Sequence, residues 1–330
     1  MTVLNRITMA AAAALALTIS GPVSAGVTWD VAIPWGASEF HTQNAMKFAE
    51  AVNKATNGEV TMVIHPGGSL GVKANESLRA VEDGSVPMAE FALFQNVGEL
   101  PILGIESIPF LVKDYAELRV MHELVRPIWE RELLKRNQKA FYMVPWPSQN
   151  FFTRKPADTL ADLKGVRMRT YDKNSAEMVS RIGMVALQMN SPDIVPALAS
   201  GKLDAVMTSG TTAAAQKYWE FLNHTYNTNH LWASNALVVN LESWNALPAD
   251  QRAKIDAIAK KMEPGFWTIS EGEHGKRMKQ LMDNGMTVSA PSAELAGAMR
   301  KATETMAAEF GKKIPDAAAV IAEFRKRTGK

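Results

Sequence analysis

The sequence contains no cysteine, which excludes disulfide bonds, thiolate metal sites and cysteine nucleophiles. A chain of this kind suits export to an oxidising compartment without covalent cross-links. The chain also has little net charge, because 36 Lys and Arg nearly balance 34 Asp and Glu and leave a net charge of +2. The balance gives no indication of binding to nucleic acid or to a membrane surface.

Only the first residues form a long apolar run. Arg6 provides a short basic region, the apolar stretch is MAAAAALALTI, and the small-residue motif VSA ends at Ala25. The run is too short to span a bilayer, and this order of segments is typical of a secretory signal peptide. We therefore expect residues 1–25 to be removed on export to the periplasm, and we expect no membrane insertion of the rest.

Motifs of catalysis and metal binding are missing as well. The six histidines have no metal-ligand spacing, and no G-x-S-x-G nucleophile motif occurs. The sequence PGGSLG lacks the Gly-Lys-Ser/Thr ending of a phosphate-binding loop and reads as a turn. The sequence thus predicts no catalytic residue, no metal site and no cofactor. Two hypotheses remain at this point, namely a binding protein without chemistry and an exported α/β enzyme that acts on a carboxylate.

The 330 residues exceed one ordinary core and fit two domains. Strand and helix patterns alternate along the whole chain. The clearest run begins with the strand VRMRT and continues through VALQM to LDAVMTS, with a helix and a glycine stop between successive strands. This run predicts a β-α-β-α-β unit with parallel strands, which bind ligands beyond their carboxyl ends.

Arg169 lies at the carboxyl end of the first of these strands, directly before a predicted helix start at Asn174 and Ser175. A guanidinium and a helix N-terminus both favour an anion, and a guanidinium holds a carboxylate through two parallel hydrogen bonds. The alternative is that Arg169 pairs with an internal Asp or Glu and fixes the sheet.

Several segments, in matching order and spacing, resemble the substrate-binding proteins of tripartite ATP-independent periplasmic (TRAP) transporters, the DctP-type solute receptors. They are FAEAVNKATNGEVTMVIHPGGSLG, SIPFLV, DLKGVRMRT, ALASGKLDAVMTS, QKYWE and ALVVNLESWNALPADQRAKI. In that family the arginine of the KG-x-[KR]-x-R strand binds the substrate carboxylate, so the resemblance assigns this role to Arg169.

The resemblance implies a two-domain α/β periplasmic binding protein (type II-like) with a hinge and a long bridging helix. The first domain comprises residues 26–146 plus 234–273, and the second comprises 147–233 plus 274–330. As partners it implies an organic acid in the cleft between the domains and the membrane permease subunits of a TRAP transporter, and we expect a monomer.

Further cleft residues follow from the resemblance and from the polar or aromatic residues near predicted strand ends. Thr208 stands where the family often has Asn, and Gln149 stands where sialic-acid binders have another arginine, so sialic acid is disfavoured. The other candidates are His41, Phe40, Gln95, Ser209, Tyr171 and Trp232.

Aromatic residues near the inferred cleft favour a monocarboxylate with an apolar or aromatic body over succinate. They are Trp35, Phe40, Trp146, Phe151, Tyr171 and Trp232.

Overall fold

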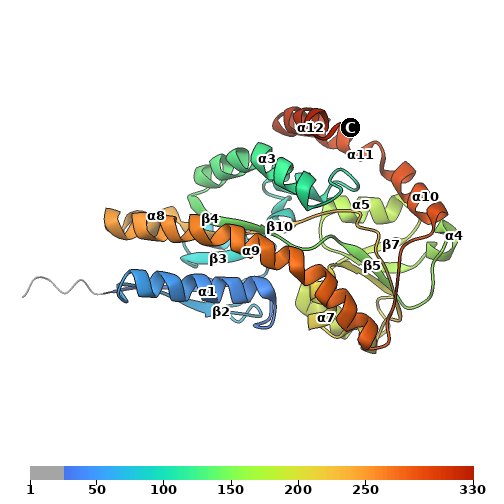
Figure 1. Ribbon diagram of the computed structural model, residues 1–330, viewed down its shortest axis with the longest axis horizontal. Helices are drawn as coiled ribbons and strands as arrows, with labels where there is room; N and C mark the ends of the chain where they lie inside the picture. The colour runs from blue at the N-terminus through green and yellow to red at the C-terminus, as the bar shows by residue number, and fades with distance from the viewer. Residues whose placement is uncertain (1–25) are drawn as a thin grey trace, which may run out of the picture.

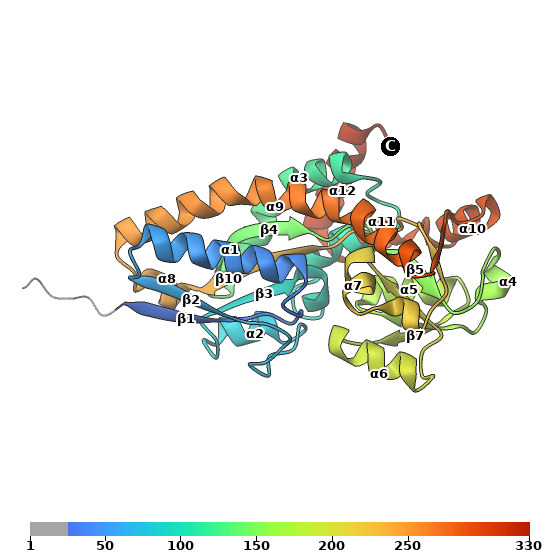
Figure 2. The same cartoon turned by 60° about the horizontal axis from the view of Figure 1, so that its bottom comes forward.

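The computed structural model describes residues 26–330, so the predicted signal peptide lies outside the described residues. The chain forms two bodies, each built on its own β-sheet, and a long helix runs along both of them (Figures 1 and 2). This is the two-domain α/β architecture that the resemblance implies.

The first sheet has the order β2-β1-β3-β10-β4. Strand β1 is parallel to β2 and β3, whereas β10 is antiparallel to β3 and β4, between which it lies. The strands are β1 (Val27–Ala32), β2 (Val60–His65), β3 (Met88–Ala92), β4 (Gln138–Pro145) and β10 (Ser234–Asn240).

The second sheet has the order β11-β9-β5-β8-β6-β7. Strand β6 is parallel to both β7 and β8, which confirms the predicted β-α-β-α-β unit. The strands are β5 (Asn150–Thr153), β6 (Arg167–Thr170), β7 (Val185–Gln188), β8 (Ala205–Thr208), β9 (His224–Tyr226) and β11 (Thr287–Ser289).

Helices cover both sheets, and short 3-10 turns connect several of them. The helices around the first sheet are α1 (Phe40–Ala55), α2 (Ser77–Glu82), α3 (Tyr115–Lys135) and α8 (Leu241–Asn245). Those around the second sheet are α4 (Leu160–Leu163), α5 (Lys173–Arg181), α6 (Ile194–Ala199) and α7 (Gly210–Ala215). The remaining helices are α9 (Ala249–Asp283), α10 (Ala293–Thr303), α11 (Met306–Lys313) and α12 (Pro315–Thr328), the last of which packs against α3.

Helix α9 is the predicted long bridging helix. It has 35 residues, which corresponds to a length of about 50 Å at 1.5 Å per residue. It packs on α1 and β4 of the first body and on α7 and β11 of the second. Within residues 26–330, no helix combines the length and the apolar character that a bilayer span requires.

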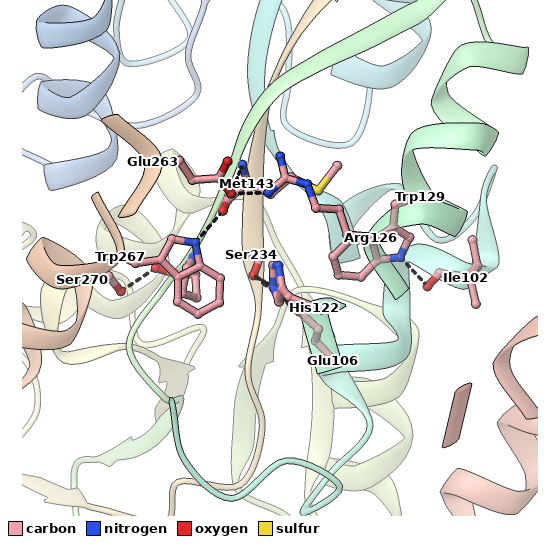
Figure 3. A network of polar contacts seen from close by, with 11 residues as sticks. Ile102, Glu106, His122, Arg126, Trp129, Met143, Ser234, Glu263, Trp267 and Ser270 are labelled. Atoms are coloured by element: carbon pink, nitrogen blue, oxygen red, sulfur yellow. Dashed lines mark hydrogen bonds and ion pairs between the residues drawn. The ribbon is translucent and has the colours of Figure 1, made fainter. Parts of the chain in front are cut away.

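A network of polar contacts attaches α3 and α9 to the strands that run between them (Figure 3). From α9, the Trp267 indole N–H donates to the carbonyl of Met143 at 2.9 Å, and the Ser270 hydroxyl donates to the carbonyl of Pro145 at 2.6 Å. From α3, His122 contacts Ser234 at the start of β10. Since β4 ends at Pro145, these contacts fix the segment that leads into the cleft.

Candidate ligand-binding site

A small cavity lies where strand ends of the two sheets face each other. Its wall residues come from the carboxyl ends of β1, β3 and β4 on one side and of β6, β7 and β8 on the other. The space inside it that the centre of a water molecule can occupy has a volume of about 30 Å³. We call it the inner cavity, and its walls are Trp35, Phe94, Gln95, Trp146, Gln149, Arg169, Tyr171, Ser191, Thr208, Ser209 and Thr212.

Arg169 is the only lysine, arginine or histidine in the cavity wall, and its side chain is 4% exposed. Its Nε donates to the carbonyl of Met189 at 3.0 Å, and Nη1 donates to the carbonyl of Met207 at 3.1 Å. No Asp or Glu among residues 26–330 forms an ion pair with it, and no hydrogen bond there uses Nη2. Burial lowers the pKa of Arg169, which is the direction expected for a cation without a counterion.

The carboxyl group nearest in sequence to Arg169 has another role. Helix α5 begins at Lys173, one residue earlier than predicted, and Asp172 caps it by accepting from the backbone N–H of Ser175 at 2.7 Å. The other carboxyl oxygen of Asp172 accepts from the Ser107 hydroxyl at 2.5 Å. The N–H of Ser175, which we predicted to face an anion, is therefore occupied by Asp172, and Arg169 is left with its charge unpaired.

Two polar atoms of the cavity wall lack a hydrogen-bond partner although they are buried. They are the amide oxygen of Gln95 and the hydroxyl of Tyr171. The ring of Tyr171 lies edge-on to that of Phe94, with 4.6 Å between centroids, so the two bodies touch here. Buried polar groups normally have partners, and these two can receive them from a ligand in the cavity.

Six of the predicted site residues line the cavity, namely Arg169, Gln149, Thr208, Ser209, Gln95 and Tyr171. Of the aromatic candidates, Trp35 and Trp146 also do so. Sequence reasoning did not assign Ser191 or Thr212 to the site. Both follow carboxyl ends of parallel strands, β7 and β8, so the rule that identified Arg169 also applies to them.

Phe40, His41 and Trp232 lie outside the cavity wall. His41, expected in the cleft, is instead fully buried, with its Nδ1 3.0 Å from a carboxyl oxygen of Glu90. Phe40 packs against Trp146 behind the wall. The indole N–H of Trp232 donates to the carbonyl of Val112 at 3.1 Å.

Behind the wall, three polar side chains lie around Glu90. The Tyr142 hydroxyl and the Asn235 amide each donate to it at 3.0 Å, and His41 faces it. Asn235 in turn accepts from the indole N–H of Trp146 at 2.7 Å. Glu90 therefore holds Asn235, and Asn235 orients the Trp146 ring that forms part of the cavity wall.

Glu39, the residue before α1, is a second buried carboxyl near the site. Burial raises its pKa to about 7, against the opposing effects of Arg277 and of a hydrogen bond from the cavity residue Thr212. Because the folded protein holds this proton at pH values where the unfolded chain has lost it, ionisation of Glu39 opposes folding.

We expect the free energy of unfolding to fall between about pH 5 and pH 7 by up to about 3 kcal/mol through Glu39, given 1.36 kcal/mol per pKa unit. Glu39→Gln keeps the shape of the side chain and removes this titration. Urea unfolding of both proteins across this range measures it. The difference in stability between variant and wild type must grow with pH, and two parallel curves would contradict the assignment.

Comparison with known proteins identifies the family. Residues 31–313 match the bacterial extracellular solute-binding proteins of family 7, the DctP family. The chain belongs to this family. One family 7 relative is the C4-dicarboxylate-binding periplasmic protein DctP of Rhodobacter capsulatus, which is 27% identical over 252 residues, or 74% of each chain.

Two solved structures resemble this family 7 protein closely. The Bordetella pertussis solute receptor DctP7, which binds pyroglutamic acid, has a TM-score of 0.88 and 27% identity, and the match covers 91% of this chain and 100% of that chain. A marine metagenome TRAP solute-binding protein in complex with pyroglutamate has a TM-score of 0.88 and 28% identity, covering 91% and 99%.

The family 7 protein is thus a solute-binding receptor of the TRAP type and not an enzyme, which decides between the two hypotheses left open by the sequence. Among residues 26–330, no group of three or more His, Asp or Glu is arranged to hold a metal ion.

Proposed function

We propose that this receptor binds a small monocarboxylate in the inner cavity, with the acid group on Arg169. The observation that carries the proposal is the buried guanidinium, which has a free Nη2 and no carboxylate partner. The unpartnered hydroxyl of Tyr171 provides a second donor for the same anion. A ligand carboxylate accepts hydrogen bonds from both donors and neutralises the charge of Arg169.

The unpartnered amide oxygen of Gln95 adds a second requirement, an N–H donor on the ligand. A ring with a carboxylate and an amide N–H, as in pyroglutamate, meets both requirements. Two structurally similar receptors bind this compound. The DctP relative is named for C4-dicarboxylates, and in this chain the cavity wall contains no cation besides Arg169 for a second acid group.

We expect pyroglutamate to bind at least about tenfold more tightly than succinate, because the second carboxylate of succinate would be buried without a counterion. Isothermal titration calorimetry of the purified protein with each acid measures the ratio. Equal affinities, or a preference for succinate, would contradict the monocarboxylate assignment.

We further propose that residues 1–25 direct the chain to the periplasm and that the loaded receptor delivers its ligand to TRAP permease subunits. The family's extracellular description and the periplasmic relative support the location. The domain boundaries 26–146 plus 234–273 and 147–233 plus 274–330 remain part of the proposal. They agree with the division of the strands between the two sheets.

A further inference from the structure

A second, larger pocket adjoins the inner cavity. Measured in the same way, its volume is about 310 Å³, compared with about 30 Å³ for the inner cavity. Trp35, Gln95 and Ser191 line both spaces, so the two adjoin each other at these residues. We call it the outer pocket, and its remaining walls are Pro34, Gly67, Gly68, Gly71, Val72, Lys73, Ala74, Asn190, Pro192 and Asp193.

The walls of the outer pocket are mainly uncharged. Val72, Ala74 and Pro192 contribute apolar surface, and the glycines contribute backbone only. The two charged residues, Lys73 and Asp193, have exposed side chains and opposite charges. Such a wall favours an uncharged and largely apolar group over a second acid group.

The loop on the first-sheet side is held in place by backbone hydrogen bonds. The N–H of Gly67 donates to the carbonyl of Trp35 at 2.7 Å, and that of Gly68 donates to the carbonyl of Ile33 at 2.9 Å. Both glycines have positive φ, 69° and 73°, a backbone conformation that residues other than glycine rarely adopt. The loop is therefore tied to the segment that carries the cavity residue Trp35.

The opposite side of the outer pocket is held by the second body. Gln216 donates to the Ser191 hydroxyl at 2.6 Å, and Asn190 reaches Asn75 of the facing loop at 3.5 Å. The pocket is thus bounded by both bodies and leads outward past Gln95 and Ser191 from the cavity that contains Arg169.

We propose that the outer pocket is a second subsite, which receives an uncharged, mainly apolar substituent of the ligand whose carboxylate binds Arg169. The inference rests on the proposed function and extends it to a ligand class, carboxylates that carry an N–H group and an apolar chain beyond it. In such a ligand the N–H lies near Gln95, at the junction of the two spaces, and the chain continues along Val72 and Pro192.

N-acylglycines test the proposal because they contain a carboxylate, an N–H and an acyl chain of adjustable length. Calorimetry with N-acetyl-, N-butanoyl- and N-hexanoylglycine is expected to give a gain in affinity of about threefold for each added methylene, since each leaves water for an apolar wall. Affinity that stays flat or falls with chain length overturns the subsite, as does the absence of N-acylglycine binding by a protein that binds pyroglutamate.

Val72→Trp fills the outer pocket and is expected to abolish the gain in affinity with chain length. The matched control is Val63→Trp, at an exposed valine on β2 that does not line either pocket. Pro192→Trp repeats the test from the opposite wall, at an exposed residue, in case the first variant does not fold. If both variants still gain as much affinity with acyl chain length as the wild type does, the subsite is overturned.

Arg169→Ala separates the two proposals. If it abolishes pyroglutamate binding while the wild-type acylglycine series stays flat, the proposed function stands and the outer subsite fails. If it leaves pyroglutamate affinity unchanged, the proposed function itself fails.

Discussion

Arg169→Ala is expected to lower the affinity for the carboxylate ligand by about 100-fold or more, because it removes charged hydrogen bonds worth roughly 1.5 to 3 kcal/mol each. Arg169→Lys is expected to lose at least about tenfold, since an ammonium is a point charge and cannot reproduce the planar fork. Calorimetric titration with pyroglutamate measures both losses.

The control is Arg167→Ala, two residues earlier on the same strand. Arg167 forms a bidentate pair with Asp204, with both contacts at 2.7 Å, and it does not line the cavity. Its loss is expected to change stability little, because the pair is exposed to solvent, and to leave affinity unchanged. If Arg169→Ala bound like wild type, the role of Arg169 would be to join β6 to its neighbours through the carbonyls of Met189 and Met207.

Glu90→Leu is expected to cost about 3 to 5 kcal/mol of unfolding free energy, because it leaves Tyr142 and Asn235 buried without their common acceptor and removes the carboxyl group that faces His41. Urea unfolding measures the loss. The same substitution should weaken pyroglutamate binding by freeing Asn235, which orients the indole of Trp146.

Glu50→Leu, at an exposed position on α1, is the matched control and should change stability by no more than about 0.5 kcal/mol. The less disruptive variant Asn235→Leu tests the orientation of the Trp146 ring separately from the loss of stability, because it removes the acceptor of Trp146 and keeps Glu90. A loss below about 1 kcal/mol in Glu90→Leu would mean that the network contributes little to the fold.

The β-α-β-α-β unit could be predicted because its signals are local. Glycines with positive φ follow the helices, as at Gly183 (84°) and Gly201 (71°), and each helix is short enough to be bounded by one cap and one stop. Since the strands of such a unit are parallel, their carboxyl ends meet at one edge of the sheet. The placement of Arg169 in the cavity wall follows from that topology.

The burial of His41 could not be predicted from its surroundings in the sequence. A histidine in the first turn of a helix normally reads as exposed, and its partner Glu90 lies 49 positions later, in the interior of a strand. The unpartnered atoms of Gln95 and Tyr171 were also unpredictable, because a missing hydrogen bond depends on every neighbour in space. Sequence patterns identify which residues are polar, whereas contacts across the fold decide which of them are satisfied.

The insertion of β10 between β3 and β4 has a consequence for the order of folding. The first sheet cannot be completed until residues 234–240 have been synthesised, about 90 positions after β4 ends. Until then one edge of β3 is unpaired and β4 has no partner strand, and closing so long a loop is slow. On the proposed route to the periplasm, a growing chain that stays incompletely folded through most of its synthesis would remain able to pass through a narrow translocation channel.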